Sequence, residues 1–317
     1  MKKITSIWIL LVVILTACSS GMITETYSTS TPSEVSDTAT PVSTPAEAQV
    51  EMLESISYAE ESLLQKLDVY IPASGEKPFP TILAIHGGGF ISKSKSLYQR
   101  LARHYAKQGY VFVSINYRLA PTDNYPAQVE DAFCALAWLH SNQDKYGFDT
   151  NRVIVTGGSA GGYLASMLGT VDDPSIYLEN CPHPYPSDPA VQAAIIYYGL
   201  YDFTDMSEYP GGSAPLEPFL GAKYEEIPIE KIEEMSPITH VNGSEPPFLI
   251  LHGTEDNQVP SFMSERFAES LDQAGVDVEL VLIPEAGHGF EALSLSNEHL
   301  AYSLSKIEKF LDRVVKP

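Results

Sequence analysis

The sequence Gly157-Gly158-Ser159-Ala160-Gly161 joins two apolar segments of this 317-residue chain. Residues 153–155, which precede it, have the composition of a strand, and residues 163–168, which follow it, continue as a helix. We therefore predict a sharp strand-to-helix turn that exposes the Ser159 hydroxyl, with glycines that let strand and helix pack closely. Ser159 is a candidate nucleophile. Glycine and serine are common residues, so this short pattern gains weight only from other features of the chain.

A second glycine-rich segment follows an apolar run upstream. Residues 81–85 are predicted to form a buried strand, which leads into His86-Gly87-Gly88-Gly89-Phe90. Consecutive glycines let a loop turn its backbone N–H groups toward a ligand. Such loops bind the negative oxygen of a tetrahedral intermediate together with the N–H of the residue after a nucleophilic serine. Here that residue is Ala160, so we expect an oxyanion hole beside Ser159.

Two polar loops lie downstream, each after a predicted strand. Residues 248–251 lead into the loop 252–260, and residues 276–283 lead into the loop 284–290. In α/β sheets the loops at the carboxyl ends of the strands carry the functional side chains. Both loops are therefore expected at the same edge of the sheet as the serine turn.

Asp256 in the first loop and His288 in the second complete a candidate catalytic triad with Ser159. The chain order serine, acid, histidine is that of α/β-hydrolases and differs from the orders in chymotrypsin and subtilisin. Glu255, the neighbour of Asp256, is an alternative acid. The histidines elsewhere in the chain have no paired spacing, so the sequence predicts neither a metal site nor a cofactor.

Over residues 67–310 the chain resembles α/β-hydrolase esterases related to hormone-sensitive lipase, and most closely the branch of bifunctional feruloyl and acetyl-xylan esterases. The segments that carry the likeness are residues 67–70, 86–90, 114–121 and 125–128, the serine turn, and the Asp256 and His288 loops. The resemblance implies an α/β-hydrolase fold and the activity of a serine esterase.

The resemblance also implies roles for single residues. The amides of Gly88 and Gly89 join that of Ala160 in the oxyanion hole. Gly158 stands where relatives of hormone-sensitive lipase usually have an aspartate, which favours the xylan-esterase-like branch. Phe90 stands where that branch usually has tryptophan, so details of the acyl pocket are expected to differ.

Predicted strands alternate with helical patterns along the chain. The strand segments are residues 67–71, 81–85, 111–116, 153–155, 191–197, 248–251 and 276–283. This alternation predicts an α/β fold with a mainly parallel central sheet and helices on both faces. One helix is expected to begin near Pro126. The spacing of Leu300, Leu304, Ile307 and Leu311 predicts a final helix with one apolar face.

The first residues have the features of an export signal. Lys2 and Lys3 precede an apolar run over residues 7–15, which is shorter than the roughly 20 residues that a membrane span needs. Residues 15–18 resemble a bacterial lipoprotein cleavage box, which implies that residues 1–17 are removed and Cys18 is lipid-modified. We then expect an extracytoplasmic protein anchored to a bacterial membrane through Cys18. Secretion after an ordinary signal is the alternative.

The rest of the chain divides by composition. Residues 18–50 are rich in Ser, Thr and Pro and have few large apolar side chains, so we predict a disordered tether. Residues 51–317 have the length of one α/β domain and are predicted to form the catalytic domain. With 19 basic and 41 acidic residues, the formal net charge of −22 argues against nucleic acid or an anionic lipid surface as the functional partner.

Two further cysteines lie in the predicted catalytic domain. Cys134 falls on the helix after Pro126, where a small buried hydrophobic side chain is the expected role, and Cys181 falls in an insertion before the strand at 191–197. Export permits a disulfide between Cys134 and Cys181. Pairing requires a Cα separation below about 7 Å, which the sequence does not show, so a disulfide and two free thiols both stay open. Neither cysteine has the sequence context of a nucleophile.

The triad predicts ester hydrolysis through an acyl-enzyme, in which Ser159 attacks, His288 moves the proton and Asp256 orients the imidazole. The resemblance implies an acetyl or feruloyl ester of a plant polysaccharide, or a small acyl ester. An amidase of the arylformamidase (kynurenine formamidase) type is an alternative, and so is a non-catalytic surface-binding lipoprotein. A prolyl-oligopeptidase-type peptidase is disfavoured by the short stretch before residue 67.

Two segments, residues 171–189 and 206–242, are expected to wall the substrate pocket. The following aromatic residues are either a surface for a sugar or phenolic group or ordinary core: Tyr197, Tyr198, Tyr201, Phe203 and Tyr209.

Overall fold

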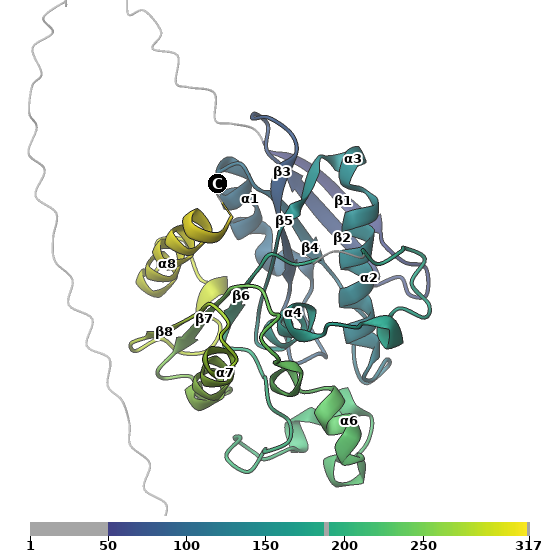
Figure 1. Ribbon diagram of the computed structural model, residues 1–317, viewed down its shortest axis with the longest axis vertical. Coiled ribbons are helices and arrows are strands. Elements are labelled where there is room, and N and C mark those ends of the chain that lie inside the picture. The colour runs from purple at the N-terminus through teal and green to yellow at the C-terminus, as the bar shows by residue number, and fades with distance from the viewer. Residues whose placement is uncertain (1–49, 187–189, 316–317) are drawn as a thin grey trace, which may run out of the picture. The chain divides into compact units, whose positions relative to one another are not determined.

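The computed structural model describes residues 50–186 and 190–315 (Figure 1). The predicted export signal, Cys18 and the predicted tether up to residue 49 lie outside the described residues. Within the described ranges one sheet has the strand order β1-β2-β4-β3-β5-β6-β7-β8. The strands are β1 (Glu51–Ser57), β2 (Lys66–Ile71), β3 (Phe79–Ile85), β4 (Val111–Ile115), β5 (Phe148–Gly158), β6 (Ala193–Tyr197), β7 (Phe248–Gly253) and β8 (Val278–Ile283).

The sheet is mainly parallel. β2 pairs antiparallel with both β1 and β4, whereas every pair of neighbours from β4 through β8 is parallel. This arrangement confirms the predicted α/β-hydrolase fold class. Because the parallel strands point the same way, the turns that follow β3, β5, β7 and β8 meet at one edge of the sheet.

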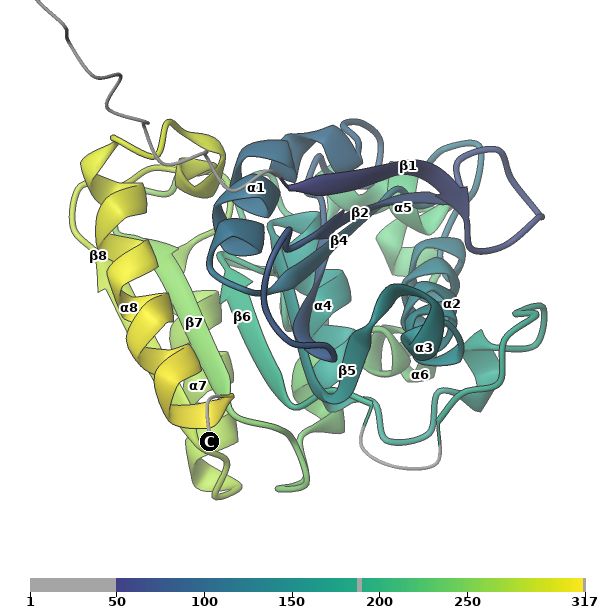
Figure 2. The ribbon, with the colours of Figure 1, turned by 90° about the horizontal axis from the view of Figure 1, so that it is seen from above.

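Helices cover both faces of the sheet (Figure 2). Their bounds are α1 (Gln99–Lys107), α2 (Ala127–Ser141), α3 (Gln143–Tyr146), α4 (Ala160–Thr170), α5 (Glu217–Leu220), α6 (Ile229–Glu234), α7 (Ser261–Gln273) and α8 (Glu298–Val314). Apolar side chains of α2, α4 and α7 belong to one buried cluster, and those of α1 and α8 belong to the other. The helices in the described part of the chain are all too short or too polar to span a membrane.

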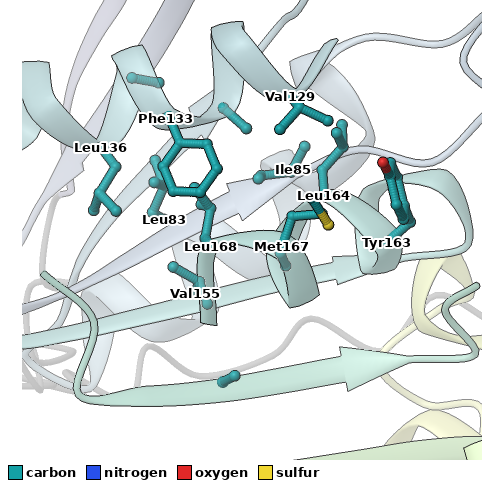
Figure 3. Packing of buried hydrophobic residues seen from close by; sticks show 14 of the residues in the cluster. Leu83, Ile85, Val129, Phe133, Leu136, Val155, Tyr163, Leu164, Met167 and Leu168 are labelled. Carbon is teal, nitrogen blue, oxygen red and sulfur yellow. The ribbon is translucent and has the colours of Figure 1, made fainter. Parts of the chain in front are cut away.

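Successive side chains along the central strands point to opposite faces of the sheet, so each strand contributes to both buried clusters. Leu83 and Ile85 of β3 pack in the cluster with α2 and α4, and Ile82 and Ala84 pack in the cluster with α1 and α8. Figure 3 shows the first of these, where Phe133 of α2 lies above side chains from β3, β5 and α4. Since both faces are apolar, the central strands are continuous apolar runs, which is why the sequence located them.

Several strands begin at other residues than the sequence predicts, and one strand was missed. β1 was not predicted, because this edge strand alternates between exposed and half-buried residues and carries no continuous apolar pattern. β5 begins at Phe148, earlier than expected. Residues 149–152 are polar and partly or fully exposed, so they do not extend the apolar run that predicted this strand. β6 and β8 begin at Ala193 and Val278, two residues later than expected. The helix after Pro126 and the final helix are confirmed as α2 and α8.

The structure corrects the expected role of Cys134. Its sulfur forms a disulfide with Cys181, with Cα atoms 5.4 Å apart. The bond joins α2 to the segment before β6, two parts of the chain separated by 47 residues. Cys134 is therefore not a free buried thiol. The pairing requires α2 and the segment before β6 to lie side by side in the fold, and the spacing of the cysteines in the sequence does not encode this.

Replacing both cysteines, Cys134→Ala with Cys181→Ala, is expected to lower the free energy of unfolding by about 4 kcal/mol. The chain-entropy model gives this value for a loop closed by residues 47 apart. Urea unfolding of both proteins in oxidising buffer measures the difference, and reducing the wild type should bring its midpoint to that of the variant. Equal midpoints in oxidising buffer would show that the pair contributes nothing.

Candidate active site

The Ser159 turn forms where β5 ends at Gly158 and α4 begins at Ala160. Ser159 has φ 58° and ψ −124°, a conformation that costs a non-glycine residue free energy and that α/β-hydrolases use to present the serine hydroxyl. Its N–H donates to the carbonyl of Tyr197 over 3.0 Å, and its own carbonyl accepts from Tyr163 over 2.9 Å. These bonds hold the strained residue between β6 and the first turn of α4.

Glycines make the turn possible because the backbones around it are in close contact. A Cβ on Gly161 would lie 1.9 Å from the Ile85 oxygen, and one on Gly157 would lie 2.3 Å from the Gly161 oxygen. Neither position has room for a side chain. The sequence thus packs the start of α4 directly against the end of β3.

The glycine loop after β3 lies against the serine. A Cβ on Gly87 would be 2.7 Å from the Gly158 oxygen and 3.3 Å from the Ser159 Cβ. Gly88 and Gly89 follow with φ of 119° and 60°, and Phe90 continues with φ 65°. The loop therefore turns beside Ser159, and its role as an oxyanion loop stays a prediction.

Three amides at this turn are available to a ligand. Among the described residues, the N–H groups of Gly88, Gly89 and Ala160 have no hydrogen-bond acceptor. The Gly88 carbonyl is occupied instead, because it accepts from the amides of Ile91 and Ser92. Ala160 is the first residue of α4, where unpaired N–H groups and the helix dipole favour an anion.

His86 supports this loop without facing solvent. It is buried and stacks on Tyr117, with ring centroids 4.3 Å apart, and its Nδ1–H donates to the Gly87 carbonyl over 2.7 Å. The Tyr117 hydroxyl donates to the His86 carbonyl over 2.9 Å. Burial lowers the pKa of His86 to about 4, so the ring is neutral and has a structural role at physiological pH.

Asp256 and His288 are directly bonded across two loops. Nδ1 of His288 lies 2.7 Å from Oδ2 of Asp256, whose side chain is fully buried. Oδ1 of Asp256 accepts from the amides of Gln258 and Val259, each over 2.9 Å. Burial by itself would raise the pKa of Asp256, but the hydrogen bonds from His288 and from the Val259 amide lower it below its ordinary value. The carboxylate is therefore ionised and holds the imidazole in one orientation.

The two loops are braced by residues that sequence reasoning did not assign. His252 at the end of β7 is buried, and its Nε2–H donates to the Val259 carbonyl over 2.8 Å while its Nδ1 accepts from Ser264. Its Nε2 is also 3.6 Å from Asp256. Burial lowers the pKa of His252, which keeps the ring neutral. Glu255, the alternative acid, is exposed and has no bond to His288.

His288 and Ser159 contact two consecutive residues of the chain, Tyr198 and Tyr197, rather than each other. The Tyr198 ring centroid is 4.5 Å from that of His288, and the preceding residue, Tyr197, binds the Ser159 amide. Within residues 50–186 and 190–315, the Ser159 hydroxyl makes no hydrogen bond with His288. Such bonds are often long in a site without substrate and shorten in the reacting complex.

The expected pocket walls are only partly correct. In the segment 206–242, Phe219 of α5 stacks on Phe90 at 3.9 Å, so this segment does reach the oxyanion loop. In the segment 171–189, Val171 and Tyr185 instead line a cavity of about 830 Å³ beside Pro247. Because Pro247 precedes β7, this cavity lies at the amino ends of the strands, away from Ser159.

Four of the five aromatic residues that end or follow β6 belong to the core. Tyr197, Tyr198, Tyr201 and Phe203 are each at most 3% exposed, and Tyr209 is partly buried. Groups of three or more His, Cys, Asp or Glu residues able to hold a metal ion do not occur in the described ranges.

The chain matches one family model and is similar in sequence to several esterases. The family model BD-FAE matches residues 67–271, more than half of the chain. The "Probable carboxylic ester hydrolase LipM" of Mycobacterium tuberculosis (strain ATCC 25618 / H37Rv) is 31% identical, over 82% of this chain and 60% of its own. The chain spans 50% to 60% of the lengths of three such curated mycobacterial relatives.

Two solved structures resemble the chain over most of its length. Esterase Est2 of the planctomycete Thermogutta terrifontis gives a TM-score of 0.69 at 26% identity, covering 86% of this chain and 94% of its own. The bifunctional GH43-CE protein of Bacteroides eggerthii gives a TM-score of 0.70 at 27% identity, covering 83% and 35%. These matches agree with the α/β fold described above. The chain belongs to the BD-FAE family of α/β-hydrolase-fold proteins.

Proposed function

We propose that this protein is a serine hydrolase of carboxylic esters. The observation that carries the proposal is the Asp256–His288 pair, with its 2.7 Å bond, at the same edge of the sheet as the strained Ser159 turn and its free amides. Esterases and a carboxylic ester hydrolase among the similar proteins support this activity.

In the proposed reaction, Ser159 attacks the ester carbonyl while Nε2 of His288 accepts its proton. Asp256 keeps Nδ1 protonated and stabilises the imidazolium that forms. The amides of Gly88, Gly89 and Ala160 bind the oxyanion, where one donor is typically worth about 10²–10³ in rate. The alcohol leaves with the proton from His288, and water then attacks the acyl-enzyme with the same base to release the acid.

Ser159→Ala is expected to abolish hydrolysis of p-nitrophenyl acetate and labelling by a fluorophosphonate, because the attacking oxygen is lost while the turn retains a Cβ of the same size. Ser166→Ala is the matched control: its hydroxyl bonds the Gly162 carbonyl inside α4 and has no place in the reaction. Circular dichroism should show both variants folded. Turnover of the Ser159→Ala variant at the wild-type rate would reject the assignment, and a wild type without labelling would favour a non-catalytic protein.

For the substrate class, we propose esters carried by a plant polysaccharide, such as acetyl or feruloyl groups. Membership of the BD-FAE family and the resemblance to a GH43-CE protein support this class. The rim of the site is also open, since Gly89 is exposed and the neighbouring Ile91 is 51% exposed. An open rim suits an ester on a large polymer better than an enclosed pocket does.

N-formylkynurenine is the substrate of the amidase alternative. We expect the protein to release acetate from acetylated xylan at least about tenfold faster than it hydrolyses N-formylkynurenine. A tenfold difference in rate corresponds to a difference of about 1.4 kcal/mol in the activation barrier. Measuring both under identical conditions, with Ser159→Ala as the blank, decides between the two classes. Faster turnover of N-formylkynurenine would replace the esterase proposal with the amidase one.

We propose further that the protein is extracytoplasmic and anchored to a bacterial membrane through lipid on Cys18. The sequence of residues 15–18 supports this placement, and the disulfide between Cys134 and Cys181 suits an oxidising compartment. Cys18→Ser is expected to move the protein from the membrane fraction to the soluble fraction and to remove incorporation of labelled palmitate. Unchanged membrane association in that variant would reject the anchor.

A further inference from the structure

Glu291 is a buried carboxyl group for which the proposed reaction has no use. It lies three residues after His288 in the turn η6 (Phe290–Ala292) and is only 4% exposed. Its Oε2 atom and the hydroxyl of Tyr198 are buried and have no hydrogen-bond partner among the described residues. The buried Tyr98 hydroxyl lies near both Glu291 and the Gly158 backbone. Buried polar atoms without partners are rare, so two of them beside an active site call for a reason.

The carboxyl occupies the space that Gly158 leaves empty. A Cβ at position 158 would lie 2.5 Å from Oε1 of Glu291 and 3.1 Å from the Tyr198 hydroxyl. Gly158 directly precedes Ser159, so Glu291 packs against the peptide that sets the nucleophile turn. A residue from the His288 loop thus fills the side-chain position next to the nucleophile.

Tyr198 connects the same cluster to His288. Its ring lies 4.5 Å from the His288 ring and 5.2 Å from that of Phe290. Its backbone is fixed, because its N–H donates to the Leu251 carbonyl over 2.9 Å and its φ is 36°, in the left-handed region. Movement of the Glu291 carboxyl would therefore disturb both the turn at Gly158 and the packing of the imidazole.

Burial favours the neutral form of this carboxyl, which therefore predominates below about pH 7. Burial raises the pKa of Glu291 to about 7, although the amides of Glu291 and Ala292 act in the opposite direction. The titratable groups that face it are Tyr98 before α1, and Tyr197 and Tyr198 at the end of β6. In the described part of the chain no lysine or arginine pairs with it.

We propose that Glu291 is a positioning residue for catalysis, whose buried carboxyl braces the Gly158 peptide and, through Tyr198, the ring of His288. The inference rests on the proposed serine hydrolase function, because Glu291 acts through Ser159 and His288. As a neutral acid the group adds no charge to the site. Once ionised, it places an unpaired buried negative charge beside the turn, where the oxyanion develops, and opposes it. Activity should therefore fall as pH rises through the pKa of Glu291.

The test compares three variants with the wild type. Glu291→Gln keeps the shape and cannot ionise, and Glu291→Leu removes the polar group. Glu285→Gln is the matched control, because Glu285 lies three residues before His288 and is exposed. The measurements are the rate of Ser159 labelling by a fluorophosphonate and the kcat and KM for p-nitrophenyl acetate, from about pH 5 to about pH 9.

The wild type and Glu285→Gln are expected to lose activity above about pH 7, whereas Glu291→Gln keeps its rate there. Glu291→Leu should lower kcat by about tenfold or more at every pH and leave KM within about threefold, because it misplaces reacting groups rather than weakening substrate binding. Thermal unfolding supplies a second measurement. Neutral Glu291 stabilises the fold at low pH, and this stability is lost as pH rises toward 7, so Glu291→Gln should gain Tm relative to the wild type over that range.

Identical pH profiles for the wild type and Glu291→Gln would overturn the positioning role while leaving Ser159 labelling, and hence the proposed function, intact. If Glu291→Leu does not fold, the profile of Glu291→Gln still decides the question. A wild type that is never labelled at Ser159 would overturn the proposed function and this inference together.

Discussion

The absence of side chains where β3, β5 and α4 meet is the constraint on which this active site depends. At Gly157 and Gly161, backbone atoms of the neighbouring element occupy the space of a Cβ, and Gly87 lies against Ser159 itself. These contacts join the strained nucleophile turn and the glycine loop into one packed unit. The unfavourable φ of Ser159 persists because hydrogen bonds to Tyr163 and Tyr197 fix the residue on both sides.

Two buried carboxyl groups at this edge of the sheet have pKa values shifted in opposite directions, and their partners explain why. Asp256 accepts hydrogen bonds from His288 and from two backbone amides, which outweigh the effect of burial and keep it ionised. Glu291 is buried among tyrosines with one oxygen unpaired, and its pKa rises to about 7. The structure thus separates the two acids by environment, one beside the imidazole and one beside the nucleophile turn.

Segments between β5 and β7 pack against the end of the glycine loop that follows β3. Phe219 of α5 stacks on Phe90, which directly follows the three glycines of the loop. The hydroxyls of Tyr125 and Tyr177 are 2.9 Å apart, and Tyr125 also donates to Glu234 over 3.2 Å. With the disulfide from Cys181 to α2, these contacts connect the insertion to the framework. Packing at a distance from Ser159 therefore contributes to the position of the oxyanion donors.

The sequence by itself determined the central strands, the helices α2 and α8, and the placement of Ser159, Asp256 and His288 in loops after strands. It could do so because these features are local: apolar runs, helical spacing and glycines at turns. The edge strand β1, the Cys134–Cys181 bond, the burial of Tyr197 to Phe203, and the roles of His252 and Glu291 were decided only by the tertiary structure. Each of these features depends on which residues from distant parts of the chain come into contact. The contact between the end of β5 and the loop after β8, for example, produces no repeating pattern in the sequence.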